Sequence, residues 1–168
     1  MAYGVVRTDL MAATDVRGGA SLVSVLYAPS NTATAIENGN VVLLNGLKTG
    51  EREIYNGVTT AANSPLEDVV LIATPEVMYD ERKHNLDEFR NEAGKISRGY
   101  HLHQNDCFSV TKDALDGATT PAVGNIVELK AGTKLNVVAT LTTNSTRVGT
   151  IIAVETAGKY TYYVIKVD

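Results

Sequence analysis

The sequence has only one cysteine, no tryptophan and four prolines in 168 residues. A single thiol, that of Cys107, excludes an intramolecular disulfide framework and a zinc site built from several cysteines. No run of about 18 apolar residues occurs, which excludes a helical membrane span. Residues 1–7 lack the charged and apolar regions of a secretory signal peptide, so we expect synthesis in a cytoplasm.

A basic excess is also missing, since 15 Lys and Arg face 19 Asp and Glu and give a formal net charge of −4. This balance argues against a nucleic-acid-binding protein, which would carry a basic patch or stripe. The length suits one compact domain, which buries roughly 70% of its unfolded surface and needs no metal or disulfide to hold a core.

The residues that are abundant favour β structure. The chain contains 20 valines, 8 isoleucines and 19 threonines, whose branched side chains fit a pleated surface better than a helix. Fourteen glycines recur beside Asn, Asp and Ser, where turns are expected. We therefore predict a mostly β fold, either a sandwich or a small barrel built from hairpins.

Short apolar runs between turn signals predict the individual strands. The run Val69–Ala73 is continuously apolar, as expected of a strand buried on both faces. The predicted strands are Ser21–Ala28, Asn40–Leu44, Arg52–Tyr55, Val69–Ala73, Tyr100–Leu102, Cys107–Thr111, Asn125–Leu129, Lys134–Thr140, Val148–Glu155 and Tyr160–Val167.

One segment, residues 85–94, predicts a short helix of about two to three turns. Leu86, Phe89 and Ala93 fall on one face at helical spacing. Asn85 is a suitable N-cap, and Gly94 can adopt the left-handed conformation that ends a helix.

Residues 1–20 predict an N-terminal arm attached to a single β-rich domain, residues 21–168. The segment is too apolar to face only water, and Gly18 and Gly19 would allow it to swing away from the domain. We expect it to pair with an exposed sheet edge of a partner and to contribute little to the fold of the body. The predicted contact residues are Tyr3, Val5, Val6, Arg7, Asp9 and Leu10.

Candidate catalytic chemistry is sparse. His101 and His103, with Asp106 and Cys107 nearby and His84 farther away, are the only plausible metal constellation, and they lack convincing third and fourth ligands. No nucleophile elbow or phosphate-binding loop occurs. We therefore predict no catalytic residues, no metal, no cofactor and no enzymatic activity.

Several blocks of the chain together resemble a known group of proteins: MAYGVVRTDLM, AIENGNVVLL, LIATPEVMYDE, LDEFRNEAGKISRGYHL, DCFSVTKDALDG and AVETAGKYTYYVIKV. The chain resembles the capsid decoration (cement) proteins and head-fibre bases of tailed bacteriophages and prophages. The similarity covers nearly the whole chain, but it includes no catalytic signature.

This resemblance implies a virion structural protein on the outer capsid surface, made in the cytoplasm of a bacterial host. Its expected partners are the major capsid protein and further copies of itself, with a trimer favoured. We expect it to bind neither nucleic acid nor a membrane. Two other hypotheses remain: a β-rich ligand- or carbohydrate-binding module, such as a head-fibre base or a host-surface adhesin, and a metal-dependent enzyme using His101, His103 and His84.

Overall fold

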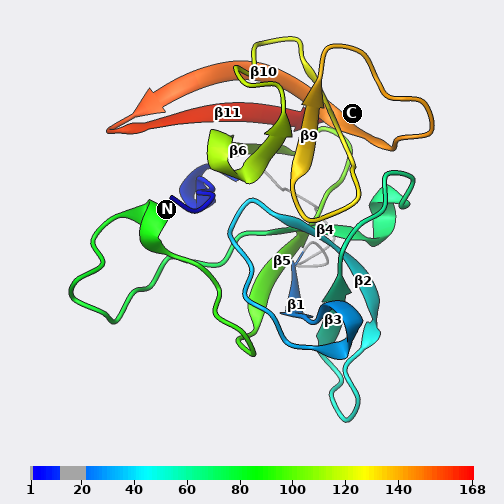
Figure 1. Ribbon diagram of the computed structural model, residues 1–168, viewed down its shortest axis with the longest axis vertical. Helices are drawn as coiled ribbons and strands as arrows, with labels where there is room; N and C mark the ends of the chain where they lie inside the picture. Colours follow the sequence, from blue (N-terminus) through cyan, green and yellow to red (C-terminus); the bar gives the residue numbers. More distant parts are fainter. Residues whose placement is uncertain (1, 12–21) are drawn as a thin grey trace.

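The computed structural model describes residues 2–11 and 22–168, which form two curled β-sheets packed against each other (Figure 1). The first sheet closes into a barrel, in the lower half of Figure 1. The second is an open, six-stranded sheet that lies above the barrel in the same view. The prediction of a mostly β fold is confirmed.

The barrel has the strand order β1-β3-β2-β4-β5. Its strands are β1 (Leu22–Tyr27), β2 (Val41–Leu47), β3 (Ile54–Val58), β4 (Val69–Ile72) and β5 (Ser97–His101). All neighbouring pairs are antiparallel except β1 and β3, which run parallel. The barrel is therefore not built from hairpins alone.

The second sheet has the order β6-β11-β10-β8-β9-β7. Its strands are β6 (Cys107–Thr111), β7 (Leu115–Gly117), β8 (Ile126–Glu128), β9 (Leu135–Val138), β10 (Arg147–Ala157) and β11 (Tyr160–Val167). The β10–β11 hairpin is its longest part, and its tip extends beyond the other strands (Figure 1).

The main hydrophobic core lies between the two sheets and unites them. Val41 and Leu71 from the barrel belong to the same buried cluster as Phe108, Ile151 and Ile165 from the second sheet. Burial of this shared core stabilises the two sheets as one body.

A second, smaller core fills the barrel. Val25, Val42, Val70 and Ile72 lie inside it, fully buried. A five-stranded barrel has little space in its interior. For example, a Cβ placed on Gly57 would lie 2.7 Å from Val25 Cγ1. Glycine suits this position because the backbone of Gly57 lies against the Val25 side chain and leaves no room for a Cβ unless that side chain shifts.

Most strand predictions agree with the structure. Residues 69–72 of β4 are fully buried, as expected for the apolar run that contains them.

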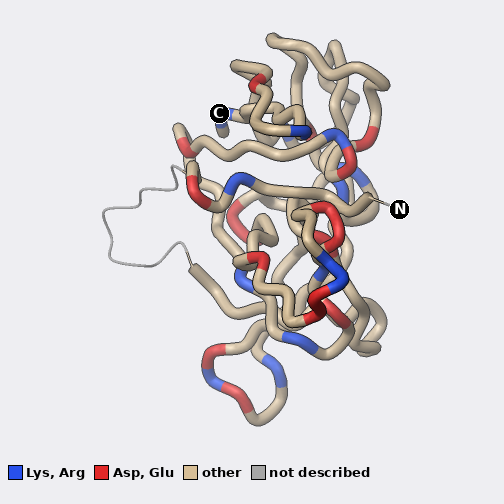
Figure 2. Tube along the Cα trace, turned by 90° about the vertical axis from the view of Figure 1, so that its left-hand side faces the viewer, with Lys and Arg blue, Asp and Glu red and all other residues tan. Residues whose placement is uncertain are grey.

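Acidic and basic positions alternate along the β2–β3 hairpin at the bottom of Figure 2, where Lys48 Nζ lies 3.7 Å from Glu51 Oε1.

The predicted helical length of residues 85–94 is wrong. Only one 3₁₀ turn forms, η4 (Leu86–Glu88), and Phe89 already has extended backbone angles. The predicted start is correct, since Glu88 Oε2 accepts hydrogen bonds from the N–H groups of His84 and Asn85. The chain then straightens because Asn91 pairs with Ile36, exchanging two backbone hydrogen bonds of 2.8 and 2.9 Å.

The other helical segments are also single 3₁₀ turns: η1 (Thr8–Leu10), η2 (Pro29–Asn31), η3 (Leu66–Asp68) and η5 (Lys112–Ala114). No helix in residues 2–11 and 22–168 is long and apolar enough to cross a bilayer. The predicted domain boundary between residues 20 and 21, like the proposed hinge at Gly18 and Gly19, lies outside the described residues.

Candidate functional site

The described N-terminal residues, 2–11, pack against their own domain, so the expectation that they contribute little to the fold is wrong. Val5 and Val6 are only 1% and 2% exposed. Val6 forms an antiparallel bridge with Val110 of β6, the edge strand of the second sheet. The segment was predicted to cover the sheet edge of a partner, and it covers the edge of its own sheet instead.

Backbone hydrogen bonds fix this segment along its length. Thr111 N–H donates to Val5 O at 2.9 Å, and Arg7 N–H donates to Ser109 O at 3.0 Å. Gly4 N–H donates to Glu37 Oε2 at 3.0 Å. The N-terminal segment thereby joins β6 to the turn that precedes β2.

Of the predicted contact residues, Asp9 and Leu10 are exposed, and Tyr3 and Arg7 are half-buried. Arg7 makes a bidentate ion pair with Asp9, with Nε–Oδ1 and Nη2–Oδ2 distances of 3.0 and 2.6 Å. Its guanidinium also lies over the ring of Tyr162, 5.5 Å from the centroid. Arg7, Asp9 and Tyr162 line a pocket.

This pocket, which we call the N-terminal pocket, has a volume of about 470 Å³. Three chain segments far apart in sequence form it: the N-terminal segment, the β4–β5 connection and the β10–β11 turn. Its walls include Leu86 and Tyr160 as well as Arg7 and Asp9, and the carboxylate of Glu76. The side chains at the site are thus both apolar and charged.

Asp87, beside the pocket, is held by the β10–β11 turn. Tyr160 O–H donates to Asp87 Oδ1 at 2.7 Å, and Lys159 Nζ lies 3.2 Å from the same oxygen. The hydrogen bond from Tyr160 and the pairing with Lys159 hold the pKa of the Asp87 carboxyl below its usual range. Lys159 and Asp87 therefore neutralise each other.

Glu76 has a different environment. Burial raises the pKa of its carboxyl. Hydrogen bonds from the backbone N–H of Glu76 and from Asn38 Nδ2 to Glu76 Oε1, the latter 3.1 Å long, offset this only in part. Asn38 is itself buried and also bonds both backbone groups of Thr74. Glu76 is thus positioned by a buried amide and not by a cation.

The β4–β5 connection, residues 73–96, is the longest irregular segment among the described residues and forms the green loop at the left of Figure 1. It exposes several apolar side chains: Tyr79 is 93% exposed and Val77 57%, and Leu86 and Ile96 are also exposed. Long ordered loops of this kind are usually functional. This connection is the strongest candidate for an interaction surface.

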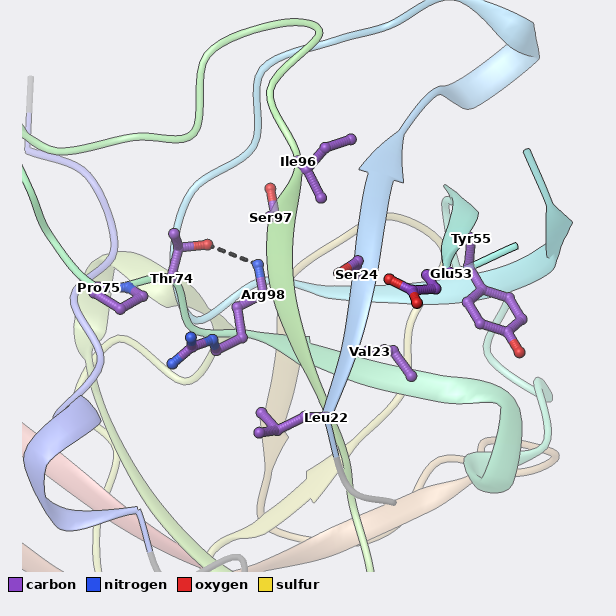
Figure 3. A pocket seen from close by; sticks show the side chains of 10 residues that line it. All are labelled: Leu22, Val23, Ser24, Glu53, Tyr55, Thr74, Pro75, Ile96, Ser97 and Arg98. Carbon is purple, nitrogen blue, oxygen red and sulfur yellow. Dashed lines mark hydrogen bonds between the residues drawn. The ribbon is translucent and has the colours of Figure 1, made fainter. Parts of the chain in front are cut away.

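A larger groove, of about 680 Å³, lies over β1 and β5 where the same connection ends (Figure 3). Thr74 and Arg98 lie on one side of β5 in this view, where Arg98 N–H donates to Thr74 Oγ1 at 3.0 Å, and Glu53 and Tyr55 lie beyond β1. Ser97 Oγ is buried there without a hydrogen-bond partner among the described residues. The groove combines hydroxyl, charged and apolar groups without a convergent set of polar ligands.

The histidines are not brought together into a ligand set. The rings of His101 and His103 are 6.3 Å apart, and His103 Nδ1 lies 3.6 Å from Asp106 Oδ2. Burial lowers the pKa of His101, and the neighbouring His103 adds to this effect. In the described part of the chain, no group of three or more His, Cys, Asp and Glu side chains is arranged to hold a metal.

Comparison with known proteins gives no further assignment: no protein-family model, curated protein or solved structure matches this chain.

Proposed function

We propose that this chain is a virion structural protein, a capsid decoration protein that binds the shell formed by the major capsid protein. The observation that supports this proposal best is the exposed apolar surface of the β4–β5 connection, carried on a body of two sheets with one shared core. No enzymatic role and no cofactor are part of the proposal.

A decoration protein needs a stiff body and an adhesive surface. The shared core supplies stiffness, because displacement of one sheet from the other would expose fully buried residues such as Leu71 and Ile151. The connection supplies adhesion, since Val77 and Tyr79 expose apolar surface that contact with a partner would remove from water.

Repetition on a lattice would strengthen a small contact. Full burial of one aliphatic side chain such as Val77 is worth roughly 1.5–3 kcal/mol, which alone gives only weak binding. Several copies held together, as in the trimer that we favour, raise the effective concentration of each contact. The outer face of a capsid presents such repeated sites.

The proposal is tested by cosedimentation of the purified chain with capsid shells assembled without it. We expect saturable binding by the wild type and at least a tenfold loss for the double variant Val77→Ser/Tyr79→Ser, roughly the effect of removing one buried apolar contact. The matched control is Leu47→Ser/Val123→Ser, which changes exposed apolar residues at the end of β2 and in the β7–β8 loop and should bind normally.

Absence of wild-type binding to the shells would contradict the proposed function. Normal binding by Val77→Ser/Tyr79→Ser together with loss of binding in the control variant would show that the β4–β5 connection is not the surface that contacts the shell.

A further inference from the structure

The N-terminal pocket contains one carboxylate, that of Glu76, which no Lys or Arg of residues 2–11 and 22–168 neutralises. Two of the cations around it are already paired, Arg7 with Asp9 and Lys159 with Asp87. No Lys or Arg among the described residues lies within salt-bridge distance of Glu76, and the like charge of Asp9 nearby raises the pKa of the Glu76 carboxyl further. The charge of the pocket is therefore set by Glu76.

The walls around this carboxylate suit a cation with an apolar stem. Leu86, Tyr160 and Tyr162 line the pocket, and Tyr162 is only 2% exposed and lies beneath the Arg7 guanidinium. Both rings already attract cations: Arg7 Cζ lies 5.5 Å from the centroid of Tyr162, and Lys159 Nζ lies 5.0 Å from that of Tyr160. Aromatic and aliphatic surface beside a carboxylate is complementary to the methylene stem and charged head of a long basic side chain.

The position of the carboxylate is fixed before any ligand binds. Asn38 is 1% exposed and donates from Nδ2 to both Glu76 Oε1 and Thr74 O, at 3.1 and 2.8 Å. Its Oδ1 accepts from Thr74 N–H and from Asn91 Nδ2. Because this network engages only one oxygen of Glu76, the carboxylate keeps capacity to accept a further charged hydrogen bond.

We propose that the N-terminal pocket binds a lysine or arginine side chain of a partner protein, with Glu76 as the counter-ion and Tyr160 and Leu86 beside the stem. This inference goes beyond the capsid-binding proposal, because the pocket would accept such a side chain from any partner. It assigns Glu76, a residue of the β4–β5 connection, to ligand binding.

The test uses small probes, so that it does not depend on the identity of the partner. Nα-acetyl-lysine methylamide and Nα-acetyl-arginine methylamide are titrated into the full chain. The readouts are the NMR signals of the Glu76 carboxyl carbon and of the Tyr160 and Tyr162 ring protons. We expect saturable shifts with one or both cationic probes and none with the neutral Nα-acetyl-norleucine methylamide.

Two variants make the assignment specific. Glu76→Gln should weaken binding about tenfold, the effect of losing one charge-assisted hydrogen bond. Glu81→Gln removes an exposed carboxylate from the same connection and should bind like the wild type. Equal shifts with the norleucine probe, unchanged binding by Glu76→Gln, or no shift with either cationic probe would overturn the inference. None of these results depends on capsid binding.

Discussion

Truncation of Val6 to alanine should destabilise the protein markedly, although Val6 is only the sixth residue of the chain. Its side chain is 2% exposed and belongs to the core between the two sheets. Removing two carbon atoms costs about 1.6 kcal/mol of transfer free energy, at roughly 0.8 kcal/mol per methylene. The cavity left beside β6 adds to this loss, so we expect a total of about 2–3 kcal/mol.

Differential scanning calorimetry measures this effect directly. For a chain of this size the expected loss lowers Tm by about 5–10 °C. The matched control is Leu10→Ala, which shortens a side chain of the same segment that is 52% exposed and should change Tm only slightly. If Val6→Ala melts at the same temperature as Leu10→Ala, the N-terminal segment is not packed on β6 in solution, and the explanation of its apolar residues fails.

Three further predictions concern the barrel and two titratable groups. Gly57→Ala should lower the free energy of unfolding by about 1–3 kcal/mol, because the new Cβ would overlap the Val25 side chain. A midpoint of urea denaturation equal to that of the wild type would refute the tight packing of the barrel. Burial alone would raise the pKa of the Glu128 carboxyl, but hydrogen bonds led by those from Thr142 outweigh it and hold the pKa below 4.5. Glu128 therefore contributes stability above pH 4.5 that is lost as the pH falls through its lower folded pKa, and thermal melts of Glu128→Gln should show less loss of stability in acid than the wild type. Partial burial also lowers the pKa of His101, so its NMR titration midpoint should lie below 6.5, and a midpoint above that value would contradict its half-buried position.

The strands were predictable because local patterns define them. Alternation, β-branched residues and turn signals lie within a few residues of one another, and the sheets bury the faces that these patterns mark. The predicted strand Tyr160–Val167, for example, coincides with β11, and Tyr163, Ile165 and Val167 of one face enter the core. The length of the helix at 85–94 was not predictable, because a long-range pairing between Asn91 and Ile36 ends it.

The candidate site depends on contacts that no local pattern reveals. The apolar N-terminus correctly indicated a segment that covers a sheet edge, but a sequence does not distinguish an edge of its own domain from that of a partner. The same holds for Glu76, whose neighbours in the sequence, Pro75 and Val77, do not indicate a pocket. It enters a pocket because Asn38, distant in the chain, folds against it.

Quantitative mass spectrometry of virion fractions purified from the cells that produce this chain would test the capsid proposal most directly. We predict that the chain co-purifies with the major capsid protein through successive density gradients and that the ratio of the two remains constant from fraction to fraction. Recovery of the chain only in the soluble lysate, with none in the virion fractions, would contradict a role as a capsid decoration protein.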